Sequence, residues 1–406
     1  MWRLVVLPFF YLHSQSGPAV AVAAGEGAYA NVRQALSAFD LSPCRGRRVL
    51  IKPNVGRAVA AGTGVVTDPQ AVAAAIDAFR EAGAETAVAE SPISGVRTFE
   101  AFAASGIAAV AEKRGCQLID LDARPPIHIA IPGGVAVRSL QVGAEVVEYD
   151  FIISLAVLKM HMHTGVSLSL KNMKGCLWRR SKVGFHMIPP IAGRSEKTID
   201  IAISDMATVL RPHFAIIDGY IGMEGLGPSA GRGRKADFAV AGPDALAVDA
   251  VACALIGVEA RQVAHLRLAA ERGCGRLDLA HLSIIPVDWR HCRVLFAPPP
   301  ADLSIDFPRV RVLDRNSCSA CQSTLLLFLQ RYGAQVFDYF PDRADITFVI
   351  GKGNNAAPDG AICVGNCAVQ SGKRGIFVPG CPPVVSEILS TISGKLCFDT
   401  EDGQGH

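Results

Sequence analysis

The chain has 406 residues, more than one hydrophobic core usually organises, so we expect two packed units. Half of the residues are hydrophobic and only 19% are charged, which predicts a large buried interior and a surface that a partner protein partly covers. The net charge of +3 is too small to indicate a nucleic-acid-binding protein.

The twelve cysteines and the N-terminus bear on the cellular compartment. In a long α/β-type chain the cysteines favour metal binding or burial in a reducing, cytoplasmic compartment over a disulfide scaffold. Residues 1–12 hold an apolar run that could be a weak signal peptide. Because Pro8 interrupts this run and no clear small-residue cleavage site follows, we interpret residues 1–18 as an extension or an added first strand. No other stretch reaches the roughly 18 apolar residues that span a bilayer, so we expect a soluble protein without a membrane span.

Short apolar segments alternate with helical ones through the first three quarters of the chain. The expected strands are residues 20–23, 48–52, 86–89, 151–156, 213–218 and 238–241. The expected helices are residues 28–39, 68–82 and 244–256, the second with Asp68 as N-cap, Pro69 at its first position and Gly83 as its stop. This alternation predicts a mainly parallel sheet with helices on both faces, over residues 19–297.

Periodicity is lost in the proline-rich stretch 298–308, which we predict as the domain boundary. Strands are expected beyond it at residues 309–313, 346–350 and 376–378, and helices at 324–332 and 384–393. Residues 309–406 are therefore predicted to form a second, smaller α/β domain.

This second domain carries a spaced set of cysteines. Cys318 and Cys321 form a CxxC pair between a strand and a helix, Cys367 follows an apolar run, and Cys381 follows a strand within PGCPP. Because all four follow strands of one parallel sheet, we expect them to converge at one edge, where neighbouring Gly and Pro let the backbone turn tightly. Four soft thiolates converging on one point predict a 4Fe-4S cluster.

Two other readings of these cysteines stay open. One is a zinc site, although zinc usually takes two CxxC pairs and the second pair is absent here. The other is a set of buried thiols. Cys363 competes with Cys367 for the third position, and the glycine of the GNC sequence (residues 365–367) favours Cys367. The order CxxC, GxC, PGCPP resembles the proximal-cluster site of the nickel–iron hydrogenase small subunit and its respiratory-complex relatives.

A second feature is the absence of acids between Asp150 and Glu196. The same segment opens with a buried strand and contains ten basic residues: Lys159, His161, His163, Lys171, Lys174, Arg179, Arg180, Lys182, His186 and Arg194. Positive groups past the carboxyl end of a parallel strand face the crevice where α/β proteins bind ligands, so we expect an anionic guest such as a carboxylate or phosphate. The alternatives are a solvated basic face and metal binding by His161 and His163.

Four segments resemble the domain-of-unknown-function 362 family. They are IKPN (residues 51–54), LKMHMHTGVSLSLKNMKG (158–175), IDGYIGMEGLGP (217–228) and AGPDALAVDAV (241–251), and the likeness extends over about residues 20–286. Members of this family are often iron–sulfur proteins, many with a ferredoxin-type insertion. This chain lacks that insertion and carries the CxxC, GxC, PGCPP set instead.

Other polar residues of these motifs fit a pocket. Lys52 and Asn54 end a buried strand, where a charge needs a partner. Residues 219–233 hold six glycines and are expected to be a loop whose amides cradle phosphate. Asp249 is expected to face a Lys or Arg. The predicted anion-site residues are Lys52, Asn54, Lys159, His161, Lys171, Asn172 and Lys174.

The leading functional hypothesis is a cytoplasmic iron–sulfur protein that acts as an oxidoreductase or electron-transfer component. The small domain carries electrons, the large domain binds an anionic small molecule, and a redox partner protein is expected. Two alternatives stay open: a non-redox α/β enzyme with a structural cluster, and an electron carrier without a substrate of its own.

Overall fold

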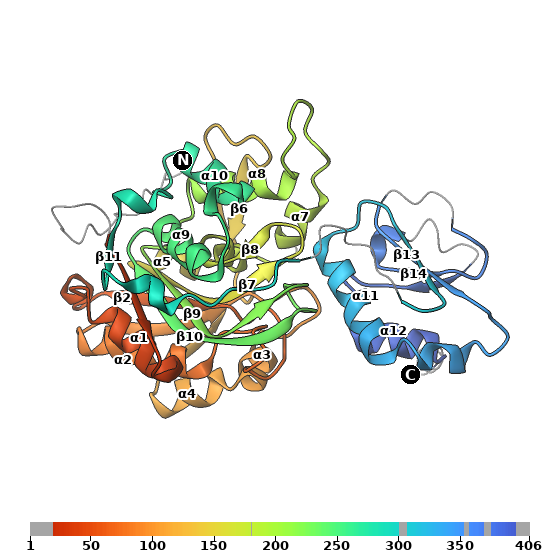
Figure 1. Cartoon of the computed structure of the whole chain (residues 1–406), viewed down its shortest axis with the longest axis horizontal. Helices are drawn as coiled ribbons and strands as arrows, with labels where there is room; N and C mark the ends of the chain where they lie inside the picture. The colour runs from red at the N-terminus through yellow and green to blue at the C-terminus, as the bar shows by residue number, and fades with distance from the viewer. Residues whose placement is uncertain (1–18, 180, 300–306, 353–356, 369–374, 395–406) are drawn as a thin grey trace, which may run out of the picture. The chain divides into compact units, whose positions relative to one another are not determined.

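A computed structural model describes residues 19–179, 181–299, 307–352, 357–368 and 375–394. The chain divides into a large unit of residues 1–227 and 231–299 and a small unit of residues 228–230 and 300–406 (Figure 1). The predicted extension 1–18, Arg180, most of the predicted boundary and Cys397 lie outside the described residues.

The large unit is built on a nine-stranded sheet. Its strand order is β11-β1-β10-β9-β7-β2-β3-β4, and β8 pairs with β7. All pairs are parallel except those of β10 with β1 and β9 and that of β8 with β7. The bounds are β1 Ala19–Ala24, β2 Arg48–Pro53, β3 Glu85–Glu90, β4 Gln117–Asp120, β7 Phe151–His161, β8 Gly165–Ser167, β9 Phe214–Glu224, β10 Arg232–Gly242 and β11 Ser283–Ile285. The predicted mainly parallel α/β class is confirmed.

Helices cover both faces of this sheet, as expected (Figure 1). Side chains alternate along β2, so that Val49 and Ile51 enter one core and Leu50 enters the other. The first core is covered by α1 Gly27–Leu36, α2 Pro69–Glu81, α3 Thr98–Ser105 and α4 Ile107–Lys113. The second is covered by α5 Glu145–Glu148, α6 Ser169–Asn172, α7 Ser181–Met187, α8 Thr198–Ala207, α9 Ala245–Ile256 and α10 Ala264–Glu271.

The strand order places a topological switch point beside β2. From β2 the chain builds outward through β3 and β4, and it then returns to add β7 and β9 on the opposite side of β2. Lys52 is in register with Ser154 of β7, so the carboxyl end of β2 lies against the middle of the longer strand β7. In open α/β sheets the crevice at such a point is where ligands bind.

Local signals explain the helix starts. The Asp68 carboxylate accepts a hydrogen bond from the amide of Gln70 at 2.8 Å, with Pro69 at the first helical position of α2. Asp244 caps α9 in the same way through the amides of Leu246 and Ala247. The predicted N-cap Asp68 is thereby confirmed.

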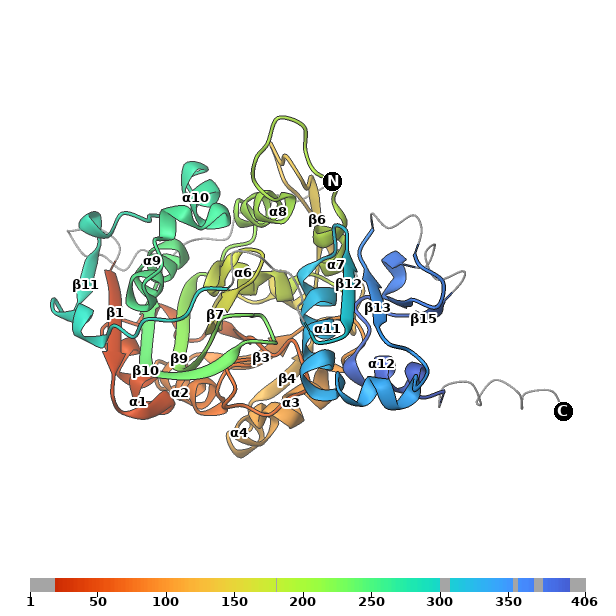
Figure 2. The ribbon, with the colours of Figure 1, turned by 45° about the vertical axis from the view of Figure 1, so that its right-hand side comes forward.

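The small unit contains a four-stranded sheet, all parallel, of order β12-β13-β14-β15. Its strands are β12 Val310–Asp314, β13 Ile346–Ile350, β14 Ile362–Val364 and β15 Ile376–Val378. The helices α11 (Ser319–Tyr332) and α12 (Val385–Ile392) lie side by side and share one core with the sheet (Figure 2). Because α11 begins at Ser319, the CxxC pair belongs to the helix start and not to a turn preceding it.

The glycine-rich segment 219–233 was expected to be a loop, and this expectation is wrong. Most of it forms the two strands β9 and β10, which pair as an antiparallel hairpin. A side-chain carbon on Gly219 would lie 2.7 Å from the ring of Phe238, and one on Gly222 would lie 2.7 Å from the Leu158 carbonyl oxygen. These two glycines therefore allow close packing of the sheet, which the sequence pattern does not distinguish from phosphate binding.

We predict that Gly222→Ala lowers the free energy of unfolding by about 1–3 kcal/mol, because the new methyl group overlaps backbone that cannot move aside. Gly184→Ala in α7 is the matched control, since nothing lies within 4 Å of its added carbon. It should leave stability unchanged or raise it by about 0.5–1 kcal/mol. Urea unfolding of both variants measures this, and equal losses would contradict the packing role of Gly222.

Candidate functional site

Lys52 is the centre of a buried polar network at the carboxyl end of β2. Its side chain is 0% exposed. The ammonium group donates to Glu90 Oε2 at 2.9 Å, to the Pro53 carbonyl at 2.7 Å and to Asn172 Oδ1 at 3.1 Å. Because a buried charge is tolerated only when it is paired, this ion pair satisfies the requirement that the sequence imposed on Lys52.

Glu90 and Asn172 join several elements around this charge. The Glu90 carboxylate, at the end of β3, also accepts the amide of Val55 at 2.8 Å. The Asn172 amide, at the end of α6, donates to the Lys52 carbonyl at 3.1 Å and to Ser154 Oγ at 3.0 Å. The network therefore fixes β2, β3, β7 and α6 to one another.

A single line of hydrogen bonds runs through this network. Lys159 Nζ donates to Asn54 Oδ1 at 2.8 Å, and Asn54 Nδ2 donates to Asn172 Oδ1 at 3.1 Å. Asn172 Nδ2 then donates to Ser154 Oγ, which donates in turn to the Ser169 carbonyl at 3.0 Å. Lys159 also donates to the Val65 carbonyl at 2.8 Å, so this buried ammonium has two acceptors.

Positive charge accumulates next to this line. The pKa of Lys159 is lowered to about 7, chiefly by burial and next by the nearby charges of Lys171 and Arg57. Burial also lowers the pKa of Lys171 to about 8, although the carboxylate of Asp200 acts in the opposite direction. Unlike Lys52 and Lys159, Lys171 is only half-buried, and its ammonium group donates to Ser167 Oγ at 3.2 Å.

His161, the histidine predicted for the site, is buried. His161 is 1% exposed, and its Nδ1 accepts the amide of His163 at 3.2 Å. Burial lowers the pKa of His161 well below its usual value, with further contributions from the charges of Lys171, His163, His186 and Lys174. His161 is therefore neutral. A second histidine, His186, contacts the Lys174 ammonium group through its ring Nε2.

The structure thus assigns different environments to the predicted residues. Asn172 joins the Lys52 network in the interior, whereas Lys171 and Lys174 are half-buried. The alternative of a solvated basic face describes Arg194, which is exposed. Within the described part of the chain, no group of three His, Cys, Asp or Glu side chains is spaced to hold a metal ion.

Two expectations about carboxylates need correction. Asp249 faces no Lys or Arg; it accepts the amides of Ser169 at 2.8 Å and Leu170 at 3.0 Å and so holds the start of α6. Asp218 lies inside β9 and not at its end, and it accepts the amide of Asp68 at 2.7 Å. Burial raises the pKa of each of these two carboxyl groups to about 7.

Sequence reasoning missed three groups near the crevice. Glu90 ends a buried strand as Lys52 does, so the same rule applied to β3 would have found it. Asp200 and His265 form a buried pair with 3.1 Å between Oδ1 and Nδ1, from α8 and α10. Lys182 is also buried, and it contacts Ser91 Oγ and lies 3.6 Å from Asp122. No local pattern marks the last two groups, because their members are far apart in the sequence.

The predicted cluster ligands of the small unit lie at the starts of loops and at one helix end. Cys318 is the N-cap residue of α11 and Cys321 lies in its first turn. Cys367 follows β14 and Cys381 follows β15, beyond the carboxyl ends of parallel strands. Cys321 is buried, and the other three are half-buried.

The loops that carry Cys367 and Cys381 are tied directly together. The Asn366 amide donates to the Gly380 carbonyl at 2.8 Å, and the Gly380 amide donates to Asn366 Oδ1 at 2.8 Å. Gly365 has φ of +93°, and a side-chain carbon there would lie 3.2 Å from the Cys321 sulfur. Only glycine therefore gives both this backbone conformation and this close approach.

Electrostatics indicate that the four sulfurs are near one another. A hydrogen bond with Cys318 raises the pKa of the Cys321 thiol far above its usual value, followed by burial and by the negative charges of the Cys318, Cys381 and Cys367 thiolates. Cys321 and Cys367 therefore favour the protonated thiol in this structure. The donor type and the glycine at position 365 suit an all-cysteine metal centre, but no three of the four sulfurs are spaced to hold a metal ion in the part of the chain that the structure describes.

Cys363 has a different environment from Cys367. It lies within β14 with 0% exposure and packs with Val349, Ala361 and Ala368. Its neighbours Ile362 and Val364 face the opposite core, under α11 and α12. Burial raises the pKa of the Cys363 thiol, and no other cysteine contributes to that shift.

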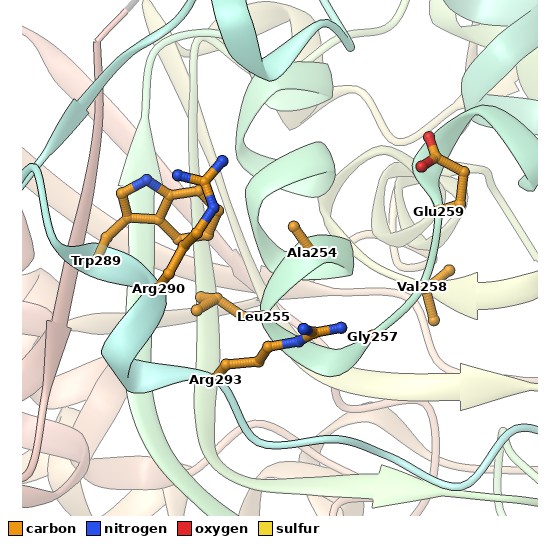
Figure 3. Close-up of a pocket in the computed structure, with 8 residues that line it drawn as sticks. All are labelled: Ala254, Leu255, Gly257, Val258, Glu259, Trp289, Arg290 and Arg293. Atoms are coloured by element: carbon orange, nitrogen blue, oxygen red, sulfur yellow. The ribbon is translucent and has the colours of Figure 1, made fainter.

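A separate cavity of about 300 Å³ lies at the C-terminal end of α9 (Figure 3). Arg290 lies over the Trp289 ring at 4.5 Å, and Arg293 reaches toward Gly257. Neither guanidinium forms an ion pair with any residue that the structure describes. None of the predicted site residues line this cavity. Its two arginines make it a second candidate position for an anion.

We predict that Lys52→Met lowers the free energy of unfolding by about 3–5 kcal/mol, because it leaves the Glu90 charge buried without its ammonium partner. Glu100→Gln is the control, since it removes the exposed Arg97–Glu100 pair and should cost only a few tenths of a kcal/mol. Urea unfolding checks both. A loss from Lys52→Met no greater than that of the control would show that the pair does not anchor the fold.

No helix in the described ranges combines the length and the apolar character needed to cross a membrane. Known proteins that are similar to this chain include the following two. A thylakoid-associated protein of Synechocystis sp. is 29% identical over 284 residues, which are 66% of this chain and 81% of that protein. The lactate racemase apoprotein of Thermoanaerobacterium thermosaccharolyticum has a TM-score of 0.40 and 12% identity, over 83% of this chain and 69% of that one.

The family described as Domain of unknown function (DUF362) matches residues 49–254. This range is narrower than the expected 20–286, but it includes all four segments on which the resemblance rests. Since the match covers half of the sequence, the chain belongs to the DUF362 family.

Proposed function

We propose that this protein is an iron–sulfur redox protein in which Cys318, Cys321, Cys367 and Cys381 ligate a 4Fe-4S cluster. The observation that carries the proposal is that Cys367 and Cys381 follow neighbouring parallel strands, in loops joined through Asn366, while Gly365 lies against the Cys321 sulfur. When bound, such a cluster takes up and releases single electrons.

The residues around the cysteines support a cluster in several ways. The start of α11 places the positive end of the helix dipole beside Cys318 and Cys321, which favours thiolates and an anionic centre. Burial and the charge of Cys318 raise the pKa of Cys367, and the positive charge of Lys352 partly opposes this rise. Iron rather than zinc is favoured by the order of the motifs, which resembles a hydrogenase cluster site. A cytoplasmic location and a redox partner protein are further parts of this proposal.

The expected test result is a brown protein after anaerobic purification, with broad absorbance that dithionite changes reversibly and with about four irons and four sulfides per chain. Cys367→Ser and Cys381→Ser should lose iron, because each removes a ligand. Cys363→Ser should keep it, because Cys363 packs in an apolar cluster. Iron, sulfide and zinc analysis of the purified variants measures this.

A colourless wild type with zinc and no sulfide would contradict the proposal. Loss of iron from Cys363→Ser with retention in Cys367→Ser would instead leave the cluster in place and overturn the ligand assignment.

We further propose that the large unit binds an anionic small molecule at the crevice between β2 and β7. Glu90 is paired with Lys52, and the charge of Lys171 lies close enough to lower the pKa of Lys159, so positive charge is in surplus beside the pair. This surplus supports an anion as the missing counter-charge. The same observation favours a second candidate function, a non-redox enzyme on an anionic substrate with a structural cluster, and the reversible dithionite response distinguishes the two.

We predict that phosphate raises the melting temperature, because a ligand at a hundredfold excess over its dissociation constant adds about 2.7 kcal/mol of stability. Lys171→Ala and Lys174→Ala should abolish this rise, and iron content should stay unchanged in both. Arg194→Ala should keep the rise, since Arg194 is exposed. Thermal melts with and without phosphate are the measurement. If phosphate binds at the Arg290–Arg293 cavity instead, Arg293→Ala should abolish the rise in melting temperature.

The anion effect should also depend on pH. Lys159, with a pKa of about 7, and Lys171, with a pKa of about 8, are charged below these values and lose their charge above them. We therefore expect stabilisation by sulfate, whose own charge is constant in this range, to decrease from about pH 6 to about pH 9. The Lys171→Ala variant corrects for the general salting effect of sulfate. An equal response in wild type and variant at every pH would refute a specific site.

A further inference from the structure

The lysines at the crevice differ in how firmly they are held. Lys52 has three hydrogen-bond acceptors and Lys159 has two, and both side chains are buried. Lys171 is half-buried and donates one hydrogen bond of 3.2 Å to a neutral hydroxyl, that of Ser167. Lys171 is therefore the least firmly held of these three amines, and its side chain can move without breaking the buried network.

Lys171 lies among several titratable groups. Lys159 is the partner of Ser167 across the β7–β8 pair, and Ser167 is the residue to which Lys171 donates, so the two lysines are neighbours. The charge of Lys171 lowers the pKa of Lys159 and of His161. Asp200 of α8 is a nearby acid, and its carboxylate also contacts the buried His265. Burial lowers the pKa of Lys171 to about 8 against the effect of Asp200, so roughly a tenth of the amine is unprotonated at pH 7.

We propose that Lys171 is a covalent nucleophile that forms a reversible imine with the carbonyl group of a 2-oxo acid, whose carboxylate is held by the cations of the crevice. A lysine amine that is partly desolvated next to another cation is the arrangement that activates it toward carbonyl groups. This inference rests on the proposed anion site and adds the chemical class of its ligand. The carbonyl supplies the electrophile, and the carboxylate supplies the negative charge that the crevice lacks.

The step balances without any further reactant. The lone pair of the neutral Lys171 Nζ forms a bond to the carbonyl carbon, and the carbonyl oxygen takes up a proton as the carbinolamine forms. The nitrogen loses its protons as the C–N double bond forms, and the oxygen leaves as water. The sum is amine plus carbonyl giving imine plus water, so nothing is oxidised or reduced.

The test traps the imine with a reducing agent. The full-length protein is incubated with pyruvate and sodium cyanoborohydride, and its intact mass and peptide map are measured. One reduced adduct per chain on Lys171 is expected, and its yield should increase from about pH 7 to about pH 9 as the amine loses its proton. Lys171→Arg keeps the charge but should lose the adduct, whereas Lys113→Arg, which changes an exposed lysine, should retain it.

Thermal melts with pyruvate, run on the same samples, separate the two proposals. If pyruvate stabilises wild type and Lys171→Arg alike and no adduct forms, the anion site stands and the covalent role of Lys171 is refuted. If pyruvate neither stabilises the protein nor forms an adduct, while phosphate also has no effect, both proposals fail. An adduct on another lysine, or one spread over many lysines, overturns the assignment to Lys171.

Discussion

The buried ion pair between Lys52 and Glu90 is the constraint on which the large unit depends. An ammonium group at the end of a central strand is intolerable without a partner, and here the partner is on the neighbouring strand at 2.9 Å. The Glu90 charge also raises the pKa of Lys159, but burial and the neighbouring positive charges outweigh this effect. The crevice at the switch point therefore keeps a positive field, and the absence of acids from residues 151 to 195 preserves it.

In the small unit the corresponding constraint concerns four cysteines, whose thiolates would repel one another. Its parallel strands deliver Cys367 and Cys381 past the same sheet edge, and Asn366 then joins their loops. The helix start contributes Cys318 and Cys321 with a favourable dipole. Such an arrangement is unfavourable for four thiolates alone, and the cluster that we propose would supply the compensating positive charge.

The sequence predicted those features that depend on short-range rules. Asp68 and Asp244 cap their helices because an oxygen acceptor directly precedes an apolar segment, and Lys52 is interior because it ends an apolar strand. The features it did not predict depend on which distant segments meet. Asp249 caps α6 although it lies 80 residues away in the sequence. Position 222 must be glycine because the Phe296 ring and the Leu158 carbonyl oxygen of β7 leave no room for a side chain.

The choice between Cys363 and Cys367 shows the same limit within one loop. Composition leaves both available, and a glycine beside Cys367 is only a local preference. The boundary of β14 at Val364 decides the environment, because alternation along the strand turns Cys363 into the apolar cluster and leaves Cys367 in the loop beyond. Strand ends are the least predictable part of a sequence reading, so this distinction required the structure.

The line of hydrogen bonds from Lys159 through Asn54, Asn172 and Ser154 to the Ser169 carbonyl has one donor direction throughout. Aligned bonds of this kind polarise one another, so the line behaves as a chain of dipoles with a charge at its head. Release of the Lys159 proton removes that charge and weakens every bond that follows. The protonation state of one amine in the crevice is thus transmitted to the first residue of α6, the helix that carries Lys171.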